Sequence, residues 1–249
     1  MHSSTAIASR MQPGDFVSGY QALREQEQWT CTDAALRQLP IVSNTDPHVT
    51  EWKIRAQSAV ELVAYFKQRS GSLLEVGCGN GWLSNLLAHE TTLQVTGLDC
   101  NPADIEQAQR VFGTGDRLNF IQGYFPAAIA PAKKFDFILF AASFHYFSEP
   151  AEMIHTALAY CKPGGQLHIT DSPFYSNHSL AAARDRSANY FMQQGFPGML
   201  AYYHHHSRDI FKKFKHTVLY QPGSISRVVA RLKGKAFNPF CWICIPQVQ

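Results

Sequence analysis

Short apolar runs alternate with segments of helical spacing through the middle of the chain. The runs are rich in Leu, Val, Ile and Phe, and they predict strands that are covered on both faces. Five such runs stand at 73–76, 92–98, 118–122, 135–140 and 166–170. The segments between them predict helices, among them 82–89 and one that starts near Pro102. Four strand and helix units in succession predict an α/β fold, with a parallel sheet between two layers of helices.

The chain before the first strand has a different pattern. Residues 50–69 carry apolar side chains at a largely helical spacing and predict a helix. Residues 13–48 hold Pro, Gly and polar clusters around one helical stretch, 32–38, which ends at Pro40. Residues 1–11 are rich in Ser and Ala and have no apolar core long enough for a secretory signal, so we interpret them as a leader.

The chain after the fifth strand predicts a helix over 180–194, then a long connection rich in Tyr, His and Phe. Two further strands are expected at 216–220 and 240–245. We therefore expect a leader and helical cap over 1–48 and one domain over 49–249, with a lid-like insertion at about 176–214.

Composition places the chain among globular proteins. It has 249 residues, of which 45% are hydrophobic and 16% charged, and no apolar run is long enough for a membrane span. Six cysteines are scattered through a chain that is too long to depend on disulfide bonds for stability, which favours a reducing, cytoplasmic environment. The net charge is +3, but residues 176–249 carry 10 Lys and Arg against 2 Asp and Glu. This basic third is interpreted as a solvated face or as a surface that attracts an anionic substrate or RNA.

The turn after the first strand points to a cofactor. Gly77, Gly79 and Gly81 stand at alternate positions, where a glycine backbone can approach a ligand closely. The helix that follows directs its free N–H groups toward the same ligand. A dinucleotide motif would read G-x-G-x-x-G, and Trp82 breaks that spacing by one residue. Glu75 is an acid within an otherwise apolar strand, where burial without donors is costly.

The run E-V-G-C-G-N-G over 75–81 resembles the first motif of class I S-adenosylmethionine-dependent methyltransferases. Two later features strengthen the resemblance: F-D-F-I at 135–138, followed by small residues, and the K-P-G-G turn at 162–165. The resemblance implies a doubly wound, seven-stranded, mostly parallel sheet, a Rossmann-like methyltransferase fold with an antiparallel last strand. It also implies S-adenosyl-L-methionine as the cofactor.

The resemblance also implies which residues hold that cofactor. Asp99 ends the second strand in register with the glycine turn and is expected to accept hydrogen bonds from the ribose hydroxyls; the alternative is that it only caps the next helix. Many family members carry an aspartate where Tyr124 stands, so adenine is expected to rest there against aromatic or apolar surface, or to be bonded by the backbone. Arg55, on the helix before the first strand, is a candidate partner for the cofactor carboxylate. The full set of expected cofactor residues is Glu75, Gly77, Cys78, Gly79, Gly81, Asp99, Cys100, Tyr124 and Ala141.

His145, after the fourth strand, is the candidate general base, because an imidazole titrates near neutral pH. The alternative is a histidine that packs against the pocket. The run His204-His205-His206 has no adjacent acid that completes a metal set, so no metal site is expected.

These features favour methyl transfer to a small molecule, with a hydroxyl as the acceptor group. The N-P-P-Y type of motif found in amino-methylating enzymes is absent after the fourth strand, where the chain has Ala141-Ala142-Ser143-Phe144. Two alternatives stay open: an RNA methyltransferase that uses the basic C-terminal third, and a module that keeps the fold and binds cofactor or partner without catalysis.

Overall fold

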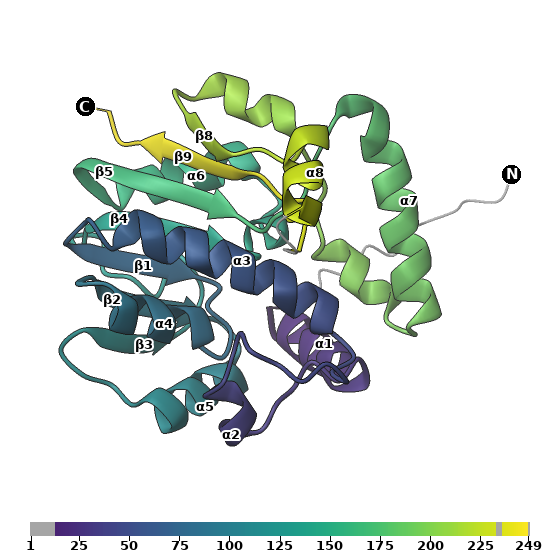
Figure 1. Cartoon of the computed structure of the whole chain (residues 1–249), viewed down its shortest axis with the longest axis horizontal. Coiled ribbons are helices and arrows are strands. Elements are labelled where there is room, and N and C mark those ends of the chain that lie inside the picture. Colours follow the sequence, from purple (N-terminus) through teal and green to yellow (C-terminus); the bar gives the residue numbers. More distant parts are fainter. Residues whose placement is uncertain (1–12, 233–235, 249) are drawn as a thin grey trace, which may run out of the picture.

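A seven-stranded sheet forms the centre of the molecule in the computed structural model, which describes residues 13–232 and 236–248 (Figure 1). The strand order is β3-β2-β1-β4-β5-β9-β8. The strands are β1 (Ser72–Val76), β2 (Gln94–Asp99), β3 (Leu118–Gln122), β4 (Phe135–Ala141), β5 (Cys161–Thr170), β8 (Thr217–Tyr220) and β9 (Trp242–Pro246). The first five pair in parallel, and β9 pairs antiparallel with both β5 and β8. The predicted fold class is confirmed, including the antiparallel last strand.

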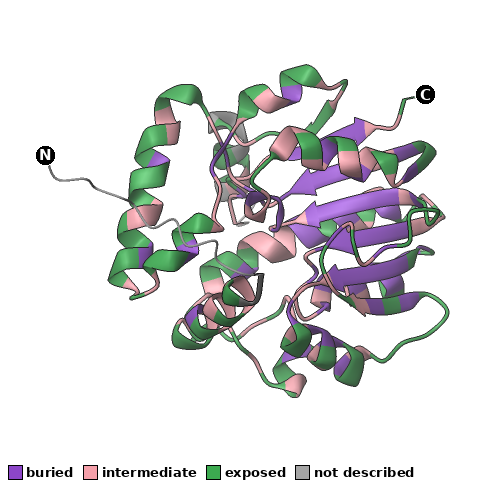
Figure 2. Cartoon of the chain, turned by 180° about the vertical axis from the view of Figure 1, so that it is seen from behind, coloured by how far each residue is buried: buried purple, intermediate pink, exposed green. Residues whose placement is uncertain are grey.

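Helices cover both faces of this sheet. The long ones are α3 (Val49–Phe66), α4 (Trp82–Glu90), α5 (Pro102–Phe112) and α6 (Pro150–Ala159). Neighbouring residues of one strand enter different clusters, because side chains alternate between the faces of a sheet: Leu73 packs in one core and Leu74 in the other. The core of Leu73 includes α3, α4 and α5, and that of Leu74 includes α6. In Figure 2 the strands are largely buried and the outer sides of the helices are exposed.

A cap of N-terminal and late segments lies beyond the carboxyl ends of the parallel strands (Figure 1). It consists of α1 (Pro13–Gln26), α7 (Asn177–Gln193) and the 3-10 turn Pro197–Ala201. Leu23, Phe191 and Met199 form a small core of their own there. The Gln26 amide nitrogen donates to the Gln194 carbonyl at 3.0 Å and ties the two ends of the cap together.

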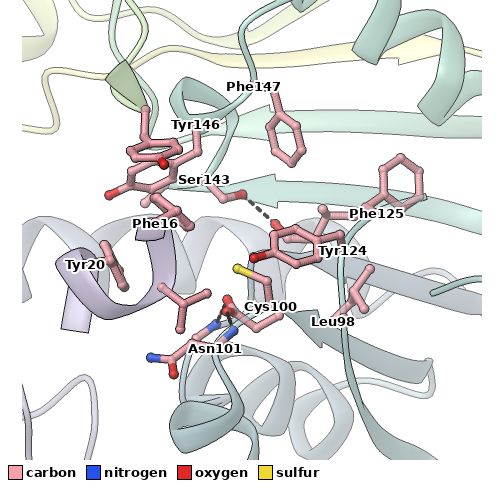
Figure 3. Close-up of a pocket in the computed structure, with 18 residues that line it drawn as sticks. Phe16, Tyr20, Leu98, Cys100, Asn101, Tyr124, Phe125, Ser143, Tyr146 and Phe147 are labelled. Carbon is pink, nitrogen blue, oxygen red and sulfur yellow. Dashed lines mark hydrogen bonds between the residues drawn. The ribbon is translucent and has the colours of Figure 1, made fainter. Parts of the chain in front are cut away.

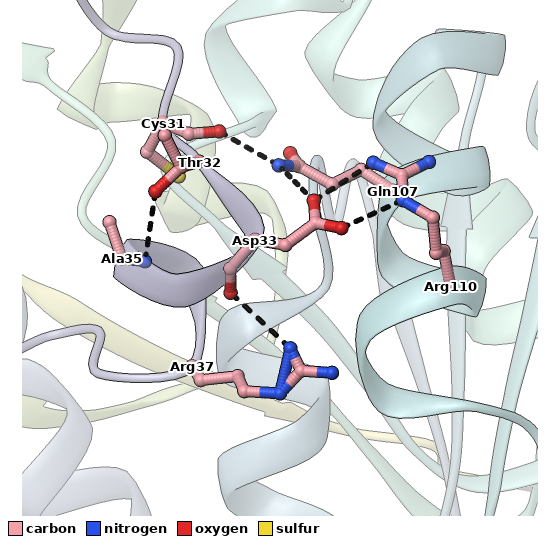
Figure 4. A network of polar contacts seen from close by, with 7 residues as sticks. All are labelled: Cys31, Thr32, Asp33, Ala35, Arg37, Gln107 and Arg110. Carbon is pink, nitrogen blue, oxygen red and sulfur yellow. Dashed lines mark hydrogen bonds and ion pairs between the residues drawn. The ribbon is translucent and has the colours of Figure 1, made fainter.

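Smaller elements complete the chain. They are α2 (Asp33–Leu36), the strand pair β6 (Phe174–Tyr175) and β7 (His206–Ser207), α8 (Ser224–Leu232), and the 3-10 turns Phe144–Tyr146 and Arg208–Lys213. A polar network fastens α2 to α5 (Figure 4). The Arg110 guanidinium donates to both carboxylate oxygens of Asp33, at 2.8 and 2.9 Å. Gln107 donates to the Cys31 carbonyl at 2.8 Å and to Asp33 at 3.2 Å, so the segment before α3 is held against the sheet domain.

Two predictions about local structure were wrong. The sequence pattern placed only loops in 13–31, whereas α1 occupies 13–26. The K-P-G-G turn was expected to precede the fifth strand, whereas β5 begins at Cys161 and contains it. The register of β5 against β4 shifts between Phe135 and Phe137, so this segment is an irregularity inside the strand. The predicted leader, as well as Lys233 and Lys235 of the basic third, lies outside the described residues.

Candidate active site

The glycine turn after β1 is locked to the end of β4. Gly77 has a φ of +77°, and a Cβ on it would lie 2.5 Å from the Ser143 Cβ. The Ser143 hydroxyl in turn donates to the Val76 carbonyl at 2.5 Å. Gly79 also has a positive φ, but a Cβ there would meet no atom within 4 Å. The turn is therefore packed closely on one side and open on the other, as a ligand cradle requires.

Asp99 bridges this turn and the start of α5. Its Oδ2 accepts a hydrogen bond from the Gly79 N–H at 2.8 Å, and its Oδ1 accepts one from the Asn101 N–H at 2.8 Å. Asn101 supplies the helix cap through its own side chain, which accepts from the Ala103 N–H at 3.2 Å. Burial raises the pKa of Asp99 to about 6, although the two backbone donors oppose this. Capping is therefore done by Asn101, and the Asp99 carboxylate faces a cavity.

That first cavity has a volume of about 360 Å³ and lies over the ends of β1, β2 and β3 (Figure 3). Its walls include Cys100 and Tyr124, which the sequence predicted, and they are mainly aromatic and apolar. Phe16 and Tyr20 reach it from α1, and sequence reasoning missed them. The signal was present, because Phe16, Tyr20 and Leu23 stand four and three residues apart, as on one side of a helix.

A second cavity, of about 550 Å³, adjoins the first. The residues that line both are Tyr20, Gly77, Gly79, Ala142 and Tyr146. The second cavity extends past the ends of β4 and β5, where Ala141, His145 and Asp171 line it. The glycine turn thus stands between two connected spaces, each large enough for part of a small molecule.

Two arginines bring positive charge to the second cavity. Arg24 from α1 and Arg55 from α3 line it, and each guanidinium carbon lies 5.3 Å from the centre of the Trp29 ring. Within 13–232 and 236–248, no carboxylate oxygen lies within 4.0 Å of either guanidinium. Burial, with the nearby charge of Arg24, lowers the pKa of Arg55. A carboxylate ligand would offset this buried charge, so the site fits a cofactor that carries one.

His145 lies in the 3-10 turn after β4 and is 7% exposed. Its ring packs on Tyr146 and Tyr203, with centroids 4.3 and 4.8 Å away. Its Nδ1 is buried with no hydrogen-bond partner in the described part of the chain. Burial, helped by His206 and Arg55, lowers the pKa of His145 to about 3. The imidazole is therefore neutral at physiological pH and a weak proton acceptor.

Three further predicted cofactor residues lie at or beside the turn, and two of them, Glu75 and Cys78, line the second cavity. A Cβ on Gly81 would lie 2.4 Å from the Phe120 ring, so this glycine allows close packing at the start of α4; it lines neither cavity. Glu75 is 2% exposed and accepts from the Ser84 hydroxyl at 2.5 Å. Burial raises the pKa of Glu75 to about 8, so its carboxyl joins β1 to α4 mainly in the neutral form. Cys78 is buried and lines the second cavity.

Two of the three consecutive histidines contact neighbouring elements. The His205 ring nitrogen Nε2 lies 2.9 Å from the Ser187 hydroxyl of α7, and His206 pairs with Phe174 between β7 and β6. Among the described residues, no group of three or more potential ligands is arranged to hold a metal ion.

Comparison with known proteins bears on the chemistry of this crevice. The family model described as a methyltransferase domain matches residues 52–220, more than half of the chain. The chain belongs to the methyltransferase domain family. The predicted methyltransferase family is thereby confirmed. The glycine turn, Asp99 and the end of β4 lie inside the matched region.

Curated relatives share part of this methyltransferase's sequence. A malonyl-[acyl-carrier protein] O-methyltransferase of Paenibacillus sp. is 32% identical over 120 residues, which cover 46% of this chain and 44% of the relative. A ubiquinone biosynthesis O-methyltransferase of Vibrio cholerae is 32% identical over 100 residues, which cover 39% and 40%. The matched regions thus span less than half the length of these relatives.

Solved structures share its fold. The plantazolicin methyltransferase BpumL, in complex with a desmethyl substrate analogue and S-adenosylhomocysteine, has a TM-score of 0.54 at 14% identity and covers 93% of this chain and 100% of its own. An O-methyltransferase family protein of Burkholderia thailandensis has a TM-score of 0.56 at 12% identity and covers 94% and 71%. In the part of the methyltransferase that the structure describes, none of the helices has both the length and the apolar character that a membrane span needs.

Proposed function

We propose that this methyltransferase transfers the methyl group of S-adenosylmethionine to a hydroxyl of a small molecule. The observation that carries this proposal is the pair of connected cavities, which meet at Gly77 and Gly79. One is mainly aromatic and borders Asp99, as suits an adenosine. The other holds two arginines that form no ion pair with a described carboxylate, and it has additional space beside β4 and β5. The names of the two curated O-methyltransferase relatives support oxygen as the acceptor atom.

The cofactor residues take separate roles in this proposal. The open side of Gly79 faces the ligand, with Cys78 beneath it, while Asp99 accepts hydrogen bonds from the ribose hydroxyls. Tyr124 and Cys100 form the wall against adenine, in place of an acid. Arg55 binds the carboxylate of the methionyl end, and Arg24 adds positive charge next to it. Ala141 and Ala142, with small side chains, leave room beside the reacting methyl group.

S-adenosylmethionine supplies an activated methyl group on a sulfonium, so the protein mainly aligns the reactants and excludes water. The segment at about 176–214 and α1 act as the lid in this proposal, since Phe16, Tyr20 and Tyr202 close the first cavity. His145 packs along the acceptor space as a neutral group, with Nδ1 free for a hydrogen bond to the acceptor.

The test combines binding and transfer. We expect calorimetry to show S-adenosylhomocysteine binding, and labelled methyl groups to enter the small-molecule fraction of a metabolite extract. Label that enters only RNA, or cofactor binding without transfer to any fraction, would contradict the proposed function.

Arg55→Gln tests the placement of the cofactor. Loss of a charged hydrogen bond is expected to weaken S-adenosylhomocysteine binding about 10- to 100-fold. Adenosine lacks the carboxylate, so its affinity is expected to stay unchanged. Arg184→Gln, an exposed position on α7, serves as the matched control. Equal losses for both ligands would show that Arg55 supports the fold rather than the carboxylate.

A further inference from the structure

Asp171 directly follows the last residue of β5 and has an uncommon backbone conformation. Its φ is +51°, one of three positive values among the described residues other than glycine. Aspartate reaches this region more easily than most residues, yet the conformation is sparsely populated and often found at functional sites. The carboxylate lines the second cavity, on the side of β4 and β5 that lies beyond the cofactor turn.

One oxygen of this carboxylate is held by two distant segments. The Ser58 hydroxyl of α3 donates to Oδ1 at 2.6 Å. The Asn238 amide, just before β9, donates to the same Oδ1 at 3.4 Å and to the Ser58 hydroxyl at 2.8 Å. Ser58 and Asn238 therefore fix the orientation of the Asp171 carboxylate through one oxygen.

The other oxygen, Oδ2, makes no hydrogen bond within the described chain. Asp99 at the cofactor turn differs, because both of its carboxylate oxygens accept backbone N–H groups. A carboxylate that is oriented on one side and unsatisfied on the other has capacity for a hydrogen-bond donor from a ligand. An O–H group is such a donor.

We propose that Asp171 binds the acceptor hydroxyl through Oδ2 and takes its proton during methyl transfer. As the acceptor oxygen forms its bond to the methyl carbon, the methyl–sulfur bond breaks and its electron pair stays on sulfur. The hydroxyl proton moves to Oδ2, which leaves Asp171 as a neutral acid that later returns the proton to water. This inference rests on the proposed function and identifies the acceptor as a hydroxyl compound.

The surroundings of Asp171 agree with a base. Burial raises the pKa of Asp171 from the ordinary aspartate value, toward neutral pH. The charged groups that act on it are Arg55, which favours the carboxylate, and Glu61, which opposes it, both from α3. Ser58 and Asn238 are neutral, and His145, which lines the same cavity, is uncharged in this range.

Asp171→Asn tests the inference, with the acceptor fraction found by the methyl-transfer screen as the substrate. Asparagine can keep the hydrogen bond from Ser58 and tolerates the left-handed backbone. We expect kcat to fall about 100-fold or more, in line with the usual contribution of a positioned base. The wild-type rate should fall as pH drops through the raised pKa of Asp171. This acidic limb of the pH–rate profile should be absent in the variant.

Two further readouts separate this role from a structural one. Binding of the acceptor to the complex of the protein with S-adenosylhomocysteine should weaken in Asp171→Asn, while the affinity for S-adenosylhomocysteine and the melting temperature stay near wild type. Ser58→Ala should give a smaller loss of kcat, because Asn238 still holds Oδ1. Asp185→Asn, an exposed acid on α7, is the matched control.

The inference is overturned if Asp171→Asn keeps the wild-type kcat and the acidic limb, or if His145→Gln removes that limb instead. Failure of the proposed function looks different, because the wild-type protein would then label no small molecule at all.

Discussion

The two halves of the crevice are built in different ways. In the cofactor half, Asp99 is held by backbone N–H groups only 20 and 2 residues away in the chain. In the half that we propose for the acceptor, Asp171 is held by side chains 113 and 67 residues away. One half is made by turns at the ends of adjacent strands, and the other by side chains that only the folded chain brings together.

This difference has a chemical meaning. Backbone donors are present in every sequence that forms the turn, so the cofactor half can stay constant while the rest of the protein changes. Side chains such as Ser58, Asp171 and Asn238 can vary independently, and specificity for an acceptor resides in such groups. The cofactor half should therefore respond to backbone changes, and the acceptor half to conservative side-chain changes.

The largest effect is expected for Gly77→Ala, which alters the turn between the halves. The new Cβ would clash with the Ser143 Cβ, and the alanine would have to keep the left-handed backbone conformation of Gly77. Together these two effects should lower the free energy of unfolding by roughly 2 to 5 kcal/mol. Gly79→Ala is the matched control, because its Cβ meets no protein atom; it should cost about 1 kcal/mol in stability. Denaturant unfolding of both variants checks this, and equal losses would show that Ser143 does not confine the turn.

Glu75→Gln should stabilise the protein at neutral pH. The native pKa of about 8 lies above the ordinary value of 4.5, so the wild-type free energy of unfolding falls as pH rises from about 4.5 to 8. An amide keeps the bond to Ser84 and does not ionise. We expect a gain of about 3 kcal/mol at pH 7 that disappears below about pH 4.5. Urea unfolding across this range is the measurement, with exposed Glu106→Gln as control; a gain independent of pH would refute the explanation.

Asp99→Asn should act on the cofactor half, where it removes the charge and leaves one of the two backbone N–H groups without its acceptor. The charged acceptor for the ribose is lost, so S-adenosylhomocysteine binding should weaken by about 1 to 3 kcal/mol. Wild-type affinity should also fall as pH drops below about 6, where the Asp99 carboxylate takes up a proton. Calorimetry between pH 5 and 8, chosen as about one unit or more on each side of this value, should show a flatter dependence in the variant. An unchanged affinity would assign Asp99 only to the turn.

The smallest effect is expected for Asp33→Asn, which weakens the network between α2 and α5. The side chains of Arg110 and Asp33 are 58% and 40% exposed, and solvent-exposed ion pairs contribute little to stability. The melting temperature should stay nearly constant, whereas hydrogen exchange of the amides in α2 should become faster. A large drop in melting temperature would show that this network, rather than the packing of α1 and α3, holds the N-terminal segment.

Much of the sheet domain could be predicted because its elements are encoded locally. The apolar run 118–122 predicted β3 with its observed bounds, and the Asn101-Pro102 pair marked the start of α5. The helix α1 was missed because its few apolar residues stand among Gly, Ser and Gln. These apolar residues pack against α7 or line the first cavity, and they do not pack on the sheet. His145 was chosen as a base from its ordinary pKa, and burial among aromatic rings changed that property.

The sequence alone determined the order of strands and helices, the glycine turn and the acid at the end of β2, because each depends on residues close together in the chain. The tertiary structure decided which groups share the second cavity, since Arg24, Arg55 and Asp171 come together there only after three separate segments have packed. It also decided their charge states, because desolvation depends on what surrounds a side chain and not on its neighbours in sequence.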